Sequence, residues 1–166
     1  MTGATRRRET ERRERLERRA RDAGLLILRL GFGLTLALQH GWGKASSYLA
    51  GSTGFPDPLG LGARPSLGLA ALGELAGLAV ALGLLTRPAA GLAAFTMAVA
   101  FFVHHAGDPL GERELALAYL LAFSTLVLTG AGRWSLDGWW RVRASRDARS
   151  AEGAARAESR RAPRGA

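Results

Sequence analysis

The sequence contains no cysteine, and this absence removes several kinds of chemistry at once. Without thiols the chain forms no disulfide, no CxxC redox centre and no thiolate-ligated iron–sulfur site. It also has no Glu-x-x-His pair, the helical motif of di-iron carboxylate bundles. Any electrons that pass through the protein must therefore be carried by a bound small molecule or by a partner subunit.

Charge is scarce in the middle of the chain and concentrated at its two ends. The 166 residues include 23 Lys or Arg and 14 Asp or Glu, a formal net charge of +9. Residues 1–23 hold nine Arg and five acids (+4), residues 133–166 nine Arg and four acids (+5), and residues 24–132 five of each sign. The basic residues lack interleaved aromatics and match no nucleic-acid motif. We therefore expect no nucleic-acid partner and favour anionic lipid headgroups at the basic ends.

Polar faces are missing from four apolar segments, each close to the roughly 20 residues that cross a bilayer as a helix. Helices that are apolar on all sides belong in a membrane. Gly73 and Gly77, four residues apart, are expected to let two such helices pack closely. We predict an all-α fold, an integral membrane antiparallel four-helix bundle, with spans at about 24–42, 66–85, 88–106 and 114–132.

The charge pattern divides the chain into three parts. Glu and Arg four residues apart in 1–23 predict a charged juxtamembrane helix. Residues 24–140 form the predicted membrane domain, and the basic segment 141–166 lacks apolar periodicity and is predicted to be disordered. Because both ends are rich in Arg, the positive-inside rule places both termini in the cytoplasm. The Ala-, Gly- and Arg-rich composition favours a bacterial source, so we expect a multi-pass protein of the bacterial cytoplasmic membrane.

Glu74 is the one charged residue within the apolar stretch 66–85. At 1.5 Å per residue it lies about 12 Å below the outer end of its span, near the midplane. Its short side chain does not reach water from there, so it must be protonated, paired or beside a polar cavity. We predict that Glu74 faces the bundle interior, with a partner such as His40, His104 or Arg29.

The predicted spans gather polar residues into two sets. The sequence singles out no catalytic residue within either set, so none is assigned. The histidine spacing is not typical of a haem or metal site, and no metal is predicted; His and Glu are suited to proton transfer. The candidate site in the outer half contains His40, Lys44, Glu74, His104 and Glu112. The candidate cluster on the inner side contains Arg29, Arg87, Arg133 and Asp137.

Two members of the inner cluster have competing interpretations. Arg29 either extends its guanidinium to the cytoplasmic headgroups or forms a buried ion pair. Asp137 either caps a helix or pairs with Arg133. The sequence leaves both choices open.

Four stretches of the chain, in order, resemble the DoxX family of small four-helix bacterial membrane proteins. They are LRLGFGLTLALQHGWGK (28–44), ELAGLAVALGLLTRPAA (74–90), MAVAFFVHHAG (97–107) and TGAGRWSLD (129–137). The likeness covers residues 24–140. The chain departs from the family pattern at Ala76-Gly77, where a Gly-Gly pair is common, and in its long Arg-rich ends.

The resemblance implies association with respiratory or thiol-redox systems. Relatives include subunits of thiosulfate:quinone oxidoreductase and of a terminal quinol oxidase, and others are linked to oxidative-stress complexes. The first hypothesis is therefore a subunit of a redox complex with a quinone-like site near His40, Glu74 and His104, in which any oxidoreductase activity depends on partner subunits. Two other hypotheses stay open, a non-catalytic membrane scaffold or assembly subunit and a small-solute carrier. A carrier is expected to have broken helices, whereas Pro88 opens a span.

Overall fold

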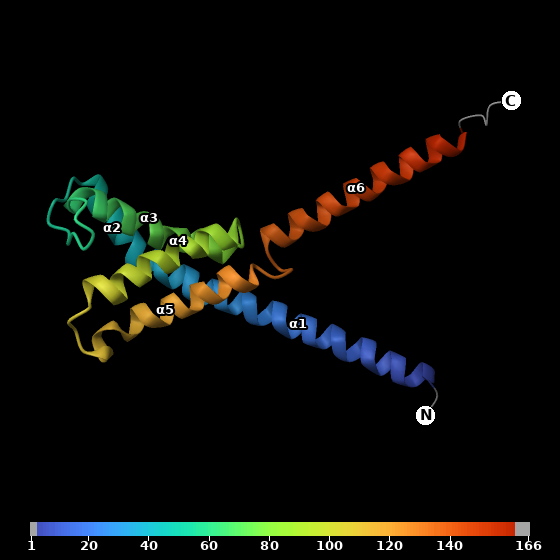
Figure 1. The fold of residues 1–166 in the computed structure, drawn as a ribbon, viewed down its shortest axis with the longest axis horizontal. Coiled ribbons are helices and arrows are strands. Elements are labelled where there is room, and N and C mark those ends of the chain that lie inside the picture. The colour runs from blue at the N-terminus through green and yellow to red at the C-terminus, as the bar shows by residue number, and fades with distance from the viewer. Residues whose placement is uncertain (1–2, 162–166) are drawn as a thin grey trace.

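The computed structural model describes residues 3–161, and the surroundings of side chains for residues 6–153. Every regular element is helical (Figure 1). No strand occurs in the described residues, so the all-α prediction is confirmed. In chain order the elements are α1 (Gly3–Thr35), the π-helical segment η1 (Leu36–Gly41), α2 (Trp42–Leu49), α3 (Ala63–Leu82), α4 (Thr86–Val99), the π-helical segment η2 (Ala100–His104), α5 (Leu110–Thr129) and α6 (Leu136–Arg161).

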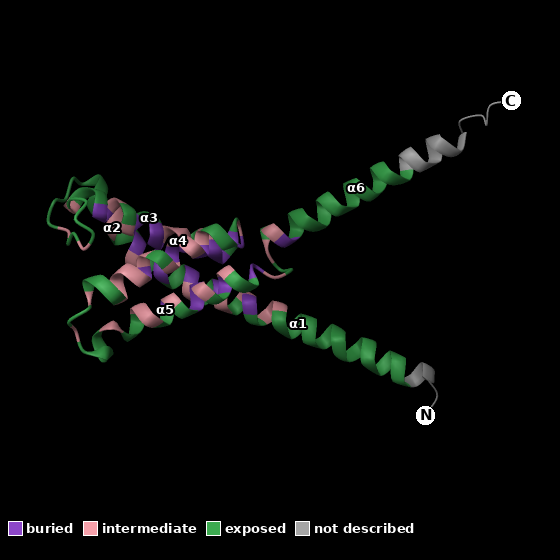
Figure 2. Ribbon diagram, viewed as in Figure 1, coloured by how far each residue is buried: buried purple, intermediate pink, exposed green. Residues whose placement is uncertain are grey.

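The molecule consists of a packed helical body and two projecting arms (Figure 1). The body contains the second half of α1, η1, α3, α4 and α5, and α3 contacts both α1 and α4. The first half of α1 and most of α6 form the arms, which leave the same end of the body (Figure 1). We call this the arm end and the opposite one the cavity end. Buried residues are concentrated in the body and the arms are exposed (Figure 2), with a core that includes Leu36, Val80, Ala93, Phe123 and Leu126.

Three continuous helices are long and apolar enough to cross a membrane, namely Arg6–Leu49, Ala63–Leu82 and Thr86–His104. The predicted fourth span differs, because α5 carries Glu112, Arg113 and Glu114 close to its start. Its uninterrupted apolar stretch is therefore 115–129, which is short against the roughly 20 residues of a perpendicular span. Crossing of the membrane by α5 is a proposal and not an observation.

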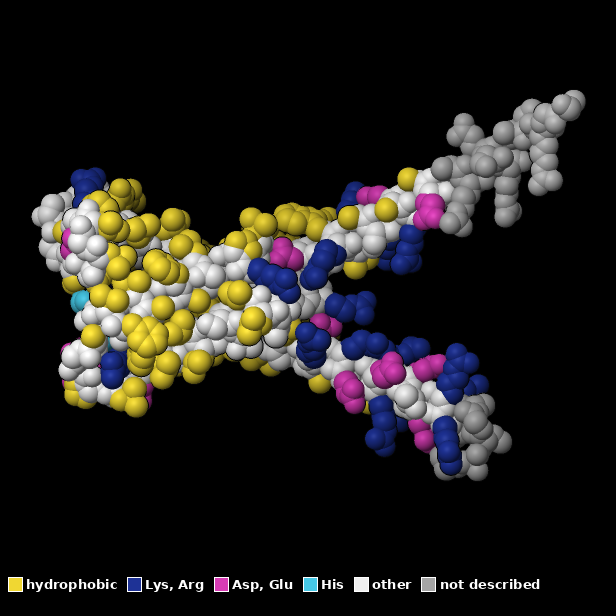
Figure 3. Space-filling view, in the orientation of Figure 1, with side chains coloured by type: hydrophobic (Ala, Val, Ile, Leu, Met, Phe, Trp, Pro, Cys, Tyr) yellow, Lys and Arg dark blue, Asp and Glu magenta, His cyan; other side chains and the backbone are white. Residues whose placement is uncertain are grey.

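Hydrophobic side chains cover the surface of the body, whereas the charged ones gather on the arms (Figure 3). Many large apolar residues are exposed there, among them Ile27, Leu72, Phe95, Leu121 and Leu128. Continuous exposed apolar surface of this kind is unfavourable in water and marks contact with a membrane or a partner. Together with the three long apolar helices, it indicates a multi-pass protein in a lipid bilayer.

Both ends of the chain are helical. The charged helix predicted for the first 23 residues is present from Gly3 and runs without a break into the apolar part of α1. The disorder predicted for 141–166 is wrong over the described part, because α6 continues to Arg161. Ala, Arg and Glu dominate this segment, and their high helix propensity needs no apolar periodicity. Residues 162–166 lie outside the described residues.

Glycines let α3 approach its neighbours closely, as predicted for Gly73 and Gly77. A Cβ atom placed on Gly33 of α1 would lie 2.5 Å from the carbonyl oxygen of Gly77 and 3.1 Å from the backbone nitrogen of Ala81. A Cβ atom on Gly73 would instead overlap the hydroxyl of Thr96 on α4. The two glycines of the pair therefore serve two different helix contacts.

We expect Gly33→Ala to destabilise the protein and Gly31→Ala to leave it unharmed. The Gly33 methyl group would push against the α3 backbone, with a cost of about 1–3 kcal/mol. A Cβ atom on Gly31, on the same helix, meets nothing within 4 Å. The measurement is the thermal unfolding midpoint of the two variants in detergent. Equal midpoints would show that the close approach of α1 and α3 is absent.

Candidate functional site

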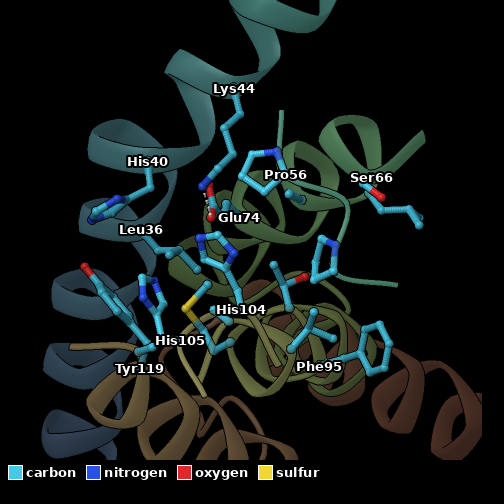
Figure 4. A pocket seen from close by; sticks show the side chains of 18 of the residues that line it. Leu36, His40, Lys44, Pro56, Ser66, Glu74, Phe95, His104, His105 and Tyr119 are labelled. Atoms are coloured by element: carbon cyan, nitrogen blue, oxygen red, sulfur yellow. Dashed lines mark hydrogen bonds and ion pairs between the residues drawn. The ribbon is translucent and has the colours of Figure 1, made fainter. Parts of the chain in front are cut away.

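A cavity of about 320 Å³ opens at the cavity end of the body. Its walls are largely apolar, with Leu36, Leu92, Phe95 and Met97 among the lining side chains. All five residues of the outer candidate site line it, and they come from η1, α2, α3, η2 and α5 (Figure 4). They are His40, Lys44, Glu74, His104 and Glu112. The structure thus brings the whole set together, and the set's role as a binding site stays a prediction.

Two π-helical turns position the histidines of this cavity. His40 lies in η1 and His104 ends η2. A π-helical turn holds more residues than an α-helical turn and therefore shifts which of the following side chains face a neighbouring helix. Such turns are frequent at functional sites. Nothing in the amino-acid pattern of these segments indicated them.

Glu74 is paired with Lys44, whose Nζ donates a hydrogen bond to Oε1 of the carboxylate (Figure 4). The Glu74 side chain is 5% exposed, so its predicted orientation toward the interior is confirmed. Its partner differs from the three residues proposed from the sequence. Lys44 follows the π-helical segment η1 in the first turn of α2, and from there its ammonium group reaches Glu74 on α3. The second carboxylate oxygen, Oε2, is buried without a hydrogen-bond partner in the described residues.

Tyr119 of α5 is a cavity residue that the sequence analysis missed. It is 4% exposed, and its ring meets those of Phe32 at 5.5 Å and His40 at 6.1 Å, both edge to face. Its phenol group is within electrostatic range of Glu74. The sequence did contain a signal for this residue. The chain has two tyrosines, and this one lies within the apolar part of its helix.

A loop from the α2–α3 connection covers part of the cavity, with Phe55, Pro56 and Pro58 in its lining. Asp57 fixes this loop by accepting hydrogen bonds from the hydroxyl of Ser66 and from backbone N–H groups at the start of α3. The Ser66 bond, followed by those N–H groups, lowers the pKa of the Asp57 carboxyl below its usual value. These hydrogen bonds tie the loop to the N-terminal end of α3.

The rim of the cavity carries a second polar pair. Nδ1 of His105 lies 2.6 Å from Oδ2 of Asp108, and both side chains are partly exposed. His104 beside it is exposed at the mouth, whereas His40 is half-buried. Across the described residues, no three His, Asp or Glu side chains are grouped as metal ligands.

Arg29 of the inner cluster is fully buried and satisfies neither sequence interpretation. Its guanidinium donates to the backbone carbonyl oxygens of Ala81 at 3.3 Å and Trp134 at 2.5 Å. It does not reach the surface, and no carboxylate of the described residues lies within ion-pair distance of it. Asp137 acts on its charge through space. Arg29 thus joins the end of α3 to the α5–α6 connection.

Asp137 caps the start of α4, one of the two roles proposed for it. Its carboxylate accepts the backbone N–H groups of Leu85 and Thr86, each at 2.9 Å. Burial raises the pKa of this carboxyl, but these hydrogen bonds outweigh it and leave the pKa below its usual value. The backbone at Leu85 is left-handed, with φ 45°. The cap therefore stabilises a tight turn that the chain would otherwise resist.

The other two members of the inner cluster act separately. The side chain of Arg133 is exposed, and its backbone N–H donates to Asp22 of α1 at 2.9 Å. The guanidinium of Arg87 donates to the carbonyl of Leu128 at 3.3 Å. The pairing of Asp137 with Arg133 is therefore not formed. The structure does not bring the four residues into one site, and each one holds a local connection.

The family model for DoxX matches residues 24–106, half of the 166-residue chain. The chain belongs to the DoxX family. The match takes in the stretches 28–44 and 74–90 and all but the last residue of 97–107, and the stretch 129–137 lies beyond it. Four of the five candidate residues of this DoxX protein fall within the match, and Glu112 does not. No curated protein and no solved structure matches the chain.

We expect Lys44→Met to destabilise this DoxX protein because it leaves the Glu74 carboxylate buried without a cation. Removing one partner of a buried ion pair costs about 3–5 kcal/mol. The combined variant Lys44→Met/Glu74→Gln removes both charges and should recover most of the loss. Thermal unfolding in detergent at neutral pH measures both variants. If the double variant is as unstable as the single one, the ion pair is not what holds α2 to α3.

Proposed function

We propose that this DoxX protein is a membrane subunit of a redox complex and that its cavity binds a quinone head group. One observation carries the proposal. Glu74 is buried and lines an apolar cavity, and one oxygen of its carboxylate, Oε2, has no hydrogen-bond donor among the residues that the structure describes. A buried acceptor without a donor lowers the stability of the folded protein, so we infer that a bound molecule supplies the donor.

The lining of the cavity fits such a group. A quinone head is flat and mostly apolar, with two opposed oxygen atoms, and its reduced form carries hydroxyl donors. Leu36, Leu92 and Phe95 offer apolar walls, while Lys44 and Tyr119 offer donors beside Glu74. The volume of about 320 Å³ is at the lower end of the range of small-molecule sites. Glu74 is placed to accept a hydroxyl and Lys44 to donate to a carbonyl oxygen.

A bound quinone would supply two-electron, two-proton redox chemistry. The residues of the chain would bind its oxygens and move the protons. Glu74 can take a proton at Oε2 while Lys44 holds Oε1. The exposed imidazole of His104 lies at the mouth of the same cavity and is placed to exchange that proton with water. Electrons would come from or go to a partner subunit of the complex.

A scaffold or assembly subunit is the second candidate, and one observation favours it. The Lys44–Glu74 pair joins α2 to α3 and Arg29 joins α3 to the α5–α6 connection, so both buried charges also hold helices together. A non-catalytic scaffold requires only such contacts between helices. A small-solute carrier is the third hypothesis, and no broken helix in the described spans supports it.

We further propose that α5 crosses the membrane as a fourth helix, antiparallel to its neighbours in the bundle, with both termini in the cytoplasm of a bacterium. The support is the position of the two charged arms at one end of an apolar body (Figure 3). Arg-rich segments remain on the cytoplasmic side. The arms would then meet the anionic headgroups of the cytoplasmic leaflet.

A reporter enzyme that is active only outside the cytoplasm tests this topology. We expect no activity when it is fused after Ala166 and full activity when it is inserted after Gly54, in the α2–α3 connection. If α5 does not cross, the fusion after Ala166 becomes active instead. That result would remove the fourth span while leaving the three apolar helices in place.

Glu74→Gln tests the quinone proposal, because glutamine keeps the shape but does not titrate. We expect normal protein level, with electron transfer by the complex purified in mild detergent lowered by about 100-fold or more, as for loss of a general acid–base. Glu114→Gln on α5 is the matched control, since Glu114 is exposed and outside the cavity lining. Quinone content is measured by mass spectrometry in each preparation. Unchanged activity at normal abundance would favour the scaffold.

A further inference from the structure

A second hollow, of about 470 Å³, lies at the arm end, between α1 and α6 where they leave the body. We call it the arginine cleft. Its lining comes from the last charged turns of α1, from the α5–α6 connection and from the first turns of α6. The arginine side chains that gather near this junction are visible in Figure 3, which colours Lys and Arg dark blue. The cleft's charged residues are Arg18, Arg21, Asp22, Arg133 and Arg141.

The cleft holds more positive charge than the chain neutralises. The lining includes four arginines and one carboxylate, that of Asp22, whose Oδ1 already accepts the backbone N–H of Arg133. Arg141 donates to the backbone carbonyl of Asp137 at 3.2 Å and interacts with its carboxylate. Arg18 pairs with Glu14 at 3.1 Å. The guanidinium groups of Arg21 and Arg133 have no partner among the described residues. Like charges gathered in one hollow repel one another, and a bound anion offsets that repulsion.

The geometry of the cleft is fixed by contacts that do not involve the arginine side chains. The bond between Asp22 and the N–H of Arg133 ties the α5–α6 connection to α1. A Cβ atom on Gly132 would come within 3.2 Å of both Asp22 and Leu25, so the connection lies directly on α1. The cleft is therefore a formed feature of the fold and not a chance meeting of two arms.

The cleft lies at the boundary between charged and apolar surface. Its lining includes Leu25, where the apolar part of α1 begins, and Val142 on α6. Beside it, Trp134, Trp139 and Trp140 are about half exposed, at 49%, 54% and 47%. Exposed tryptophan next to an apolar span is typical of the headgroup level of a membrane.

We propose that the arginine cleft binds the phosphate group of an anionic phospholipid. Guanidinium groups bind phosphate oxygens through paired hydrogen bonds, and several of them converge here. Leu25 lies where α1 enters the apolar body, next to the surface that the acyl chains of a lipid would contact. This site is separate from the cavity at the opposite end and does not rest on the proposed quinone function.

The test measures lipid retained by the purified full-length protein, by native mass spectrometry in detergent. Phosphatidylglycerol is titrated, with phosphatidylcholine as the zwitterionic lipid for comparison. The cleft variant is Arg21→Gln/Arg141→Gln, and the control is Arg12→Gln/Arg149→Gln, which removes the same charge from exposed positions outside the cleft. Circular dichroism and gel filtration check that each variant folds.

We expect the wild type and the control to retain phosphatidylglycerol. The cleft variant should bind it with an affinity lowered by about tenfold or more, because two charge-assisted contacts are lost. Competition by millimolar inorganic phosphate would show that the phosphate chemistry is right but that its source is the free ion. Equal weakening in the cleft and control variants would overturn the proposal, because general positive charge would then explain binding. Equal retention of phosphatidylcholine would overturn it as well.

Discussion

Two charges are buried in an apolar body, and the arrangement of its helices depends on satisfying them. The carboxylate of Glu74 near the middle of α3 is met by Lys44, and the guanidinium of Arg29 near the C-terminal end of α3 is met by backbone carbonyls. In a membrane no water is present to replace a lost partner, so both groups depend on partners that the protein itself supplies. Each of them requires helices to approach closely. A Cβ atom on Gly41 would lie 2.9 Å from the backbone of Leu75, which shows how near η1 comes to the Glu74 segment.

The two ends of the body consequently differ in chemistry. At the arm end, Arg29 and Asp137 direct their hydrogen bonds to backbone groups of turns, so they stabilise connections. Both Nε of Arg29 and Oε2 of Glu74 are buried without a hydrogen-bond partner among the described residues. Of these two residues only Glu74 lines the cavity, where a bound molecule could supply the missing partner, whereas Arg29 lines neither the cavity nor the arginine cleft. This contrast is why the proposed quinone site is placed at the cavity end alone.

The π-helical turns connect this chemistry to the fold. Both occur where helices of the body reach the cavity, and each carries a histidine. A strictly α-helical α1 would present a different side of the following turn to α3, and Lys44 would no longer be aimed at Glu74. The unusual backbone therefore assembles the site from residues that are otherwise spread over five elements.

The sequence by itself determined the helical class, the apolar spans, the charged arms and the burial of Glu74. All of these follow from how charged and apolar residues are distributed along the chain. It also identified five of the polar residues that line the cavity, since depth along a helix can be counted. Only the tertiary structure decided the partners. Lys44 instead of a histidine meets Glu74, carbonyl oxygens meet Arg29, and Tyr119 joins the cavity. These choices depend on local helix winding and on close backbone contacts such as that of Gly33 with Gly77. Neither feature can be predicted from the hydrophobic periodicity of the sequence.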